Sequence, residues 1–262
     1  MAADPPPYRP GLQVIPRPPR HRPGGPAAWA RLPAGERRHV TVDRVAGAVR
    51  DRNRSGDAPS GDRQVAEFIR SFSGIDPSVR PSAVLVALFE EAGEARVVLT
   101  VRSSRMRSHR GEVAFPGGRL DAGEGTDDAA LREAQEEVGL DPSAVTLVGH
   151  LTAMPTVSSN TLMTPVVATL STRPALVGGP DEVDRVFDVG LAELLEDGVF
   201  REEWWAIPGR PGRDGRTGGE FPVWFFQAGG EVIWGATARV LTELLCLVLG
   251  LPGPHDQPAG LA

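Results

Sequence analysis

The chain has 262 residues, a formal net charge of −6 and a hydrophobic fraction of 40 %. That length and apolar content suit one large globular domain with appendages. Its single cysteine, Cys246, excludes an internal disulfide and any metal site built from several cysteines. No segment is long and apolar enough to span a membrane, and the N-terminus lacks the apolar core of a signal peptide. We therefore expect a cytoplasmic protein.

Charge is unevenly distributed along the chain. Residues 1–60 contain 11 Arg and 5 acidic residues, whereas the whole chain is negative, so the acidic excess lies in residues 61–262. An acidic body favours cation binding and makes nucleic acid an unlikely partner.

The dense Pro and Gly of the first 34 residues, and a second polar stretch near residue 55, leave no apolar period that could form a core. We predict a disordered or weakly ordered Pro/Arg-rich arm and linker over residues 1–61. A folded domain over 62–252 and a flexible tail over 253–262 follow.

Apolar periodicity predicts the elements of this domain in chain order. Expected helices lie at 62–72, 126–138, 191–195 and 237–249, with weak helical character at 40–50. Expected strands lie at 82–89, 96–101, 145–151, 163–170 and 222–227, and Glu90–Glu94 reads as a hairpin turn. Strands mixed with helices predict an α/β sandwich.

The helix expected at 126–138 carries the strongest signal for function. Glu133, Glu136 and Glu137 are three, four or one residue apart, so they project in nearly one direction. Like charges on one face repel unless a cation lies among them. Carboxylate oxygens suit Mg2+ or Mn2+, which commonly bridge to substrate phosphates. The pattern predicts a metal site for phosphoryl chemistry.

The run from Gly118 to Leu140 has the spacing G-x5-E-x7-R-E-U-x-E-E-x-G-U, with U apolar. It resembles the Nudix box, with every fixed position filled. Nudix hydrolases cleave a nucleoside diphosphate linked to another group. The resemblance implies a Nudix-type α/β/α sandwich with a mixed central sheet, in which the box forms a loop, a helix and a loop.

The same resemblance implies roles for the charged residues of the box. Glu136 and Glu137 are the first choice as metal ligands, with Glu133 beside them. Arg132 and Glu124 are placed to pair with each other or with neighbouring carboxylates, and so to hold the metal ligands in orientation.

A second pattern lies directly upstream, between Val98 and Gly118. It resembles the motif L-L-T-x-R-[SA]-x3-R-x3-G-x3-F-P-G-G of the coenzyme A pyrophosphatase branch of Nudix enzymes, with Val98 in place of the first Leu. Arg102 and Arg107 occupy its fixed arginine positions, and guanidinium groups bind phosphate oxygens in pairs. Gly117 and Gly118 let the backbone approach a substrate closely.

The resemblance implies hydrolysis of coenzyme A or a derivative to adenosine 3′,5′-bisphosphate and 4′-phosphopantetheine or its acyl form. The general base stays open between Glu133 and Glu182, since Asp181-Glu182-Val183 resembles a second acidic site of this branch. For His109, a phosphate contact and a packing role are equally plausible. The pantetheine end is expected to contact Trp204–Trp205 or the loop 209–219.

Two alternatives remain. The protein could be a Nudix hydrolase of another nucleoside diphosphate derivative, such as ADP-ribose or NADH, although the upstream motif weighs against this. It could also be a Nudix-fold module that senses a nucleotide without cleaving it, but the complete set of carboxylates favours catalysis. The expected partner is a small-molecule substrate, and a homodimer is possible.

Overall fold

The structure is a computed structural model that describes residues 13–55, 79–106, 109–156, 161–179, 181–206 and 219–254. The helix expected at 62–72 and the side chain of Arg107 lie outside these residues, as do most of the loop 209–219 and the tail from residue 255. Within the described part, no helix could cross a membrane.

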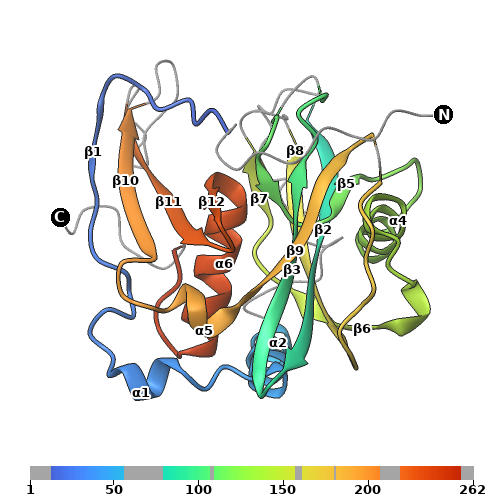
Figure 1. Ribbon diagram of the computed structural model, residues 1–262, viewed down its shortest axis with the longest axis horizontal. Coiled ribbons are helices and arrows are strands. Elements are labelled where there is room, and N and C mark those ends of the chain that lie inside the picture. The colour runs from blue at the N-terminus through green and yellow to red at the C-terminus, as the bar shows by residue number, and fades with distance from the viewer. Residues whose placement is uncertain are drawn as a thin grey trace.

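A mixed sheet of eight strands forms the centre of the molecule (Figure 1). Its middle is the parallel pair β2 (Arg80–Glu91) and β8 (Thr161–Leu170), and β3 (Glu94–Arg102) lies antiparallel to β2. Ala92 and Gly93 have φ of 53° and 78°, the left-handed values that a two-residue hairpin turn needs. The other strands are β4 (Val113–Ala114), β5 (Gly117–Arg119), β6 (Val145–His150), β7 (Met154–Thr156) and β9 (Val183–Gly190).

Helix α4 (Thr126–Val138) covers one face of this sheet and has the bounds that the sequence predicts. Ala129, Ala130, Ala134 and Val138 pack into a cluster of buried residues from β2, β3 and β8. Gly139, with φ of 69°, ends the helix and donates its N–H back to the last turn. The small alanines let the helix lie close to the sheet. Its acidic stripe, formed by Glu133, Glu136 and Glu137, lies at the edge of this interface.

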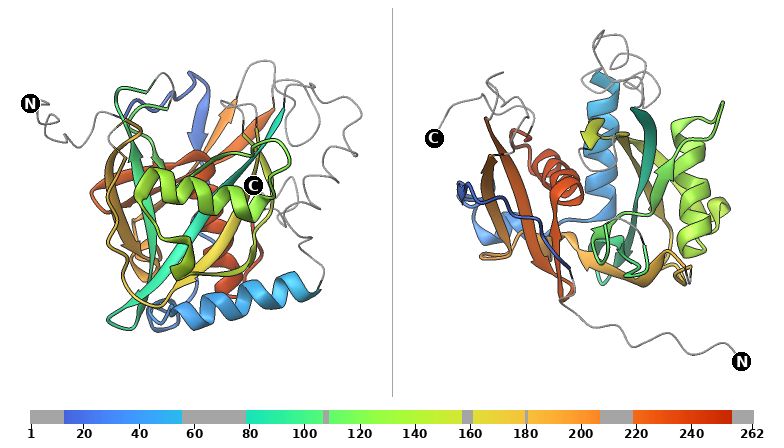
Figure 2. Two further views of the ribbon diagram at one scale, coloured as in Figure 1. Left: turned by 90° about the vertical axis from the view of Figure 1, so that its right-hand side faces the viewer. Right: turned by 90° about the horizontal axis from the view of Figure 1, so that it is seen from above.

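The opposite face of the sheet is covered by α2 (Val42–Ser55) and α6 (Gly235–Val248), so the α/β/α sandwich with a mixed central sheet is confirmed. A second sheet lies on the far side of these helices, and Figure 2 shows the helices between the two sheets. It is antiparallel and contains β1 (His21–Pro23), β10 (Phe200–Ala206), β11 (Glu220–Ala228) and β12 (Glu231–Trp234). Three short helical turns complete the described elements: α1 (Ala34–Arg37), η1 (Pro142–Ala144) and α5 (Leu191–Leu194).

Residues 1–61 were predicted to be a disordered or weakly ordered arm and linker, but within them 13–55 contain β1, α1 and α2 and pack onto the domain. Trp29 is 1 % exposed and packs edge-on against Phe200 and face-on against Phe226, with ring centroids 5.2 and 6.2 Å apart. Val45 and Val49 of α2 are fully buried. Residues 13–34 lack an apolar period of their own, but Trp29 packs against rings more than 150 residues away in sequence.

Candidate active site

Arg132 connects the carboxylates of the α4 stripe. Its Nε and Nη2 donate to the two carboxylate oxygens of Glu124 at 2.8 and 3.0 Å. Its Nη1 donates to Glu133 and to Glu136, in each case at 3.1 Å. The hydrogen bond from Arg132 holds the pKa of Glu124 below its ordinary value. The structure therefore brings four predicted residues into one cluster, with Arg132 as the cation among them.

Glu137 is the most buried carboxylate of the stripe, with 6 % of it exposed. Its Oε2 accepts a hydrogen bond from the Gly117 N–H at 3.0 Å, and its Oε1 lies 3.6 Å from Nη1 of Arg102. Burial raises the pKa of Glu137 to about 7, and the Gly117 hydrogen bond and the Arg102 charge oppose that rise. Holding Glu137 in its ionised form therefore costs folding free energy, and a cation bound beside it would lower that cost.

Gly117 and Gly118 allow β5 to pass close to both β2 and α4. A Cβ atom on Gly118 would lie 2.3 Å from Oε1 of Glu133, and one on Gly117 would lie 2.3 Å from the carbonyl oxygen of Ala83. Burial also raises the pKa of Glu133. The close approach that these glycines permit is thus to the protein's own carboxylate and backbone.

Glu182 reaches the same region from the turn before β9. Its carbonyl oxygen accepts a hydrogen bond from the Ser103 N–H at 2.8 Å, which ties the turn to the end of β3. The negative charge of Glu182 contributes to the raised pKa values of both Glu133 and Glu137. The sheet therefore places Glu182 close enough to act on two box carboxylates that are more than 40 positions away in sequence.

No three acidic or histidine side chains of the described part converge tightly enough to hold a metal ion as they stand. Glu133 and Glu136 instead face Arg132. The chemistry of the set nevertheless fits a hard divalent cation, because every donor is a carboxylate oxygen and Gly118 leaves room for the Glu133 carboxylate. A cation shared by the three carboxylates would need Glu133 and Glu136 to turn from Arg132 toward Glu137.

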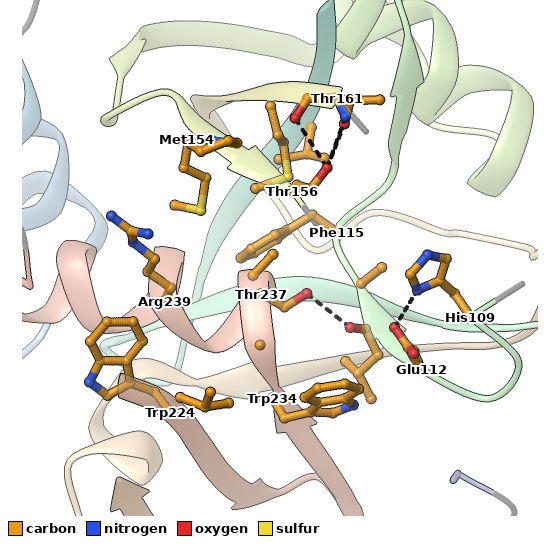
Figure 3. A pocket seen from close by; sticks show the side chains of 18 of the residues that line it. His109, Glu112, Phe115, Met154, Thr156, Thr161, Trp224, Trp234, Thr237 and Arg239 are labelled. Carbon is orange, nitrogen blue, oxygen red and sulfur yellow. Dashed lines mark hydrogen bonds and ion pairs between the residues drawn. The ribbon is translucent and has the colours of Figure 1, made fainter. Parts of the chain in front are cut away.

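A cleft of about 930 Å3 opens between the two sheets beside this cluster (Figure 3). Arg102, Gly117 and Gly118 line it on the side of the central sheet. The second sheet and α6 supply an aromatic wall of the cleft, made of Phe221, Trp224 and Trp234 together with Arg239. The sequence patterns did not predict that these side chains line a cleft. Trp205, one of the two tryptophans expected at the pantetheine end, also lines the cleft.

The aromatic wall was visible in the sequence only as a high density of Phe and Trp near residues 221–226. Which of these rings face the cleft depends on the second sheet. Phe225 and Phe226 are buried and do not line the cleft, whereas Trp224 lines it and lies under the guanidinium of Arg239, whose Cζ is 5.9 Å from the ring centroid. Sequence patterns without this sheet could not assign the faces.

Comparison of the sequence with known proteins identifies the family of the chain. The model of the NUDIX domain matches residues 79–206. An uncharacterized Nudix hydrolase NudL of Citrobacter koseri is 34 % identical over 186 residues, which cover 68 % of this chain and 91 % of that protein. Nudix hydrolase 22, chloroplastic, of Arabidopsis thaliana is 37 % identical over 194 residues, covering 71 % of this chain and 61 % of the relative.

Nudix hydrolase 3 of Caenorhabditis elegans is 38 % identical over 144 residues, which cover 50 % of this chain and 60 % of that protein. The matched part of this chain thus spans about three fifths of the plant and nematode relatives, but nearly the whole length of the Citrobacter one. The matched region includes β2, β3, α4 and the turn that carries Glu182. The family model matches residues 79–206, and the Citrobacter relative is matched over 91 % of its length. The chain therefore belongs to the Nudix hydrolase family.

Proposed function

We propose that the protein hydrolyses the diphosphate bond of coenzyme A or a derivative with Mg2+ or Mn2+. The products are adenosine 3′,5′-bisphosphate and 4′-phosphopantetheine or its acyl form. Membership of the family supports hydrolysis of a nucleoside diphosphate derivative. The single observation that carries the choice of coenzyme A is segment 98–118, whose pattern resembles that of the coenzyme A branch and whose Arg102 lines the cleft.

Glu133, Glu136 and Glu137 would hold the metal ion. When bound, the ion would neutralise non-bridging phosphate oxygens and lower the pKa of an attacking water. Glu124 fixes the Arg132 guanidinium through two hydrogen bonds, and Arg132 in turn limits where the Glu133 and Glu136 carboxylates can turn. These two residues thus position the ligands.

The general base is Glu133 or Glu182 in this proposal. The two carboxylates lie close enough for the charge of Glu182 to contribute to the raised pKa of Glu133, and burial raises that pKa further, which makes the Glu133 carboxylate a stronger base. Arg102, 3.6 Å from Glu137, is the cation best placed to bind the diphosphate beside the metal ligands. The aromatic wall would face the part of the substrate beyond the diphosphate.

Purified protein with coenzyme A, ADP-ribose or NADH, each with Mg2+ or Mn2+, tests this proposal by mass analysis of the products. Cleavage of coenzyme A into the two named products supports it. Cleavage of ADP-ribose or NADH alone would keep the Nudix reaction and contradict the argument from segment 98–118. Nucleotide binding without cleavage under any metal would favour the sensor alternative.

The Glu136→Gln variant tests the ligand assignment. It should lose turnover and keep the fold, whereas Glu196→Gln, which changes an exposed glutamate outside the site, should keep both. An active, metal-dependent Glu136→Gln protein would contradict the role of Glu136. Homodimerisation and a cytoplasmic location stay predictions, and sedimentation velocity tests the first.

A further inference from the structure

The connection from β3 to β4 places an imidazole in the cleft. His109 has φ of 58°, a left-handed value that is uncommon for a residue with a side chain. Backbone hydrogen bonds fix the turn: Gly111 N–H to the Arg102 oxygen at 3.0 Å, Arg102 N–H to the Glu112 oxygen at 2.9 Å, and Glu112 N–H to the His109 oxygen at 3.2 Å. His109 is therefore held at a defined position next to Arg102.

Glu112 orients the ring of His109. The Nδ1 atom of His109 lies 2.8 Å from Oε2 of Glu112, and the two side chains are 24 % and 25 % exposed (Figure 3). A proton on Nδ1 is engaged by this carboxylate, so Nε2 is the ring nitrogen left to face a ligand. Among the described residues, none forms a hydrogen bond with Nε2. Both side chains line the cleft.

The charges around His109 favour its protonated form. The hydrogen bond to Glu112 raises the pKa of His109 above 6.5, while burial and the positive charge of Arg102 oppose the rise. Arg102 in turn lies 3.6 Å from Glu137 on α4. Arg102 and, when protonated, His109 therefore give the cleft two neighbouring positive charges next to the expected metal ligands, where a substrate diphosphate has its negative charge.

We propose that His109 binds the substrate together with Arg102, with Nε2 donating a hydrogen bond to a non-bridging oxygen of the diphosphate. Glu112 is the positioning residue that orients the imidazole. The inference rests on diphosphate hydrolysis at this site and does not depend on which nucleotide carries the diphosphate. A packing role alone would not explain a left-handed backbone and a carboxylate partner in the wall of the cleft.

The His109→Asn variant removes the cation and keeps a residue type that tolerates left-handed φ. We expect KM to rise roughly 10- to 100-fold, as for loss of a charge-assisted hydrogen bond, and kcat to change much less. His109→Lys supplies a permanent cation and should recover part of this loss. His39→Asn, at an exposed histidine before α2, is the matched control and should behave as the wild type.

The pH dependence of KM separates binding from packing. In the wild type, KM should rise as the pH passes upward through the pKa of His109, because only the protonated ring carries the charge. Glu112→Gln removes the group that raises this pKa, so the rise in KM should move to lower pH. His109→Lys should show no such rise between about pH 6 and about pH 9.

Titration of each variant with inorganic pyrophosphate and Mg2+ in a calorimeter gives a readout that does not need turnover. Weaker pyrophosphate binding by His109→Asn, with an unchanged melting temperature, supports the proposal. An unchanged affinity and unchanged KM would overturn it, as would a lower melting temperature and lower kcat at constant KM. If coenzyme A is not cleaved, only the choice of substrate fails, and the pyrophosphate affinities still decide the role of His109.

Discussion

Replacing Glu137 by Gln should stabilise the metal-free protein at alkaline pH and remove its stabilisation by metal. The carboxylate is buried, accepts the Gly117 N–H and lies 3.6 Å from Arg102. A glutamine is of similar size and keeps an acceptor oxygen for Gly117. What the substitution removes is a negative charge that the folded protein holds at a cost.

The cost follows from the pKa of Glu137, which burial raises from 4.5 to about 7. A shift of roughly 2.5 units corresponds to about 3 kcal/mol of unfolding free energy. Because the pKa in the folded state lies above the unfolded value, the favourable contribution is complete below about pH 4.5. It is lost as the pH rises through about 7. Wild type and variant should therefore differ little at acid pH and most at about pH 8.

Thermal unfolding in EDTA at about pH 5 and about pH 8 measures this difference. For a chain of this size, about 3 kcal/mol corresponds to a melting temperature higher by roughly 6–12 °C in the variant at the higher pH. Added Mg2+ should raise the melting temperature of the wild type and leave that of Glu137→Gln unchanged. A variant less stable than the wild type at both pH values would refute the reasoning, since the attraction to Arg102 would then outweigh the burial.

Three further predictions test contacts within the site and the packing of the N-terminal segment. Arg132→Lys removes the guanidinium that holds Glu124 through two nitrogens, so kcat should fall by about 10- to 100-fold with little change in melting temperature. Full activity of the variant in steady-state kinetics would contradict this prediction. Gly118→Ala places a Cβ against the Glu133 carboxylate, so Mn2+ affinity measured by calorimetry should fall about tenfold or more. Trp29→Ala empties a fully enclosed aromatic position and should cost about 3–5 kcal/mol in urea unfolding, and a cost near zero would show that the N-terminal segment does not stabilise the domain.

The sequence determined the elements whose rules are local. Helix α4 begins and ends where predicted, because its alanine period, its acidic first turn and Gly139 all lie within the helix or next to it. The same local geometry places Glu133, Glu136 and Arg132 within reach of one another, since residues three and four apart share a helix face. The central strands β2, β3 and β8 were also predictable from continuous apolar runs.

Tertiary structure alone decided the features that depend on partners far away in sequence. The second sheet gains its edge strand β1 because His21–Pro23 pairs with Glu203–Trp205, about 180 positions away in sequence. The aromatic wall of the cleft depends on how this sheet packs opposite the central sheet, and Trp29 is buried because Phe200 and Phe226 of the second sheet pack against it.

Long-range contacts also brought Glu182 to the box carboxylates and placed the β3–β4 connection, which carries Arg102 and His109, in the wall of the cleft. Local propensity and spacing carry information only over a few residues, about one helical turn or one hairpin. The sequence alone thus determined the acidic helix α4 and the reaction class that its motif resembles. The walls of the cleft and the groups that reach the diphosphate from other elements required the packed fold, because only packing brings distant segments together.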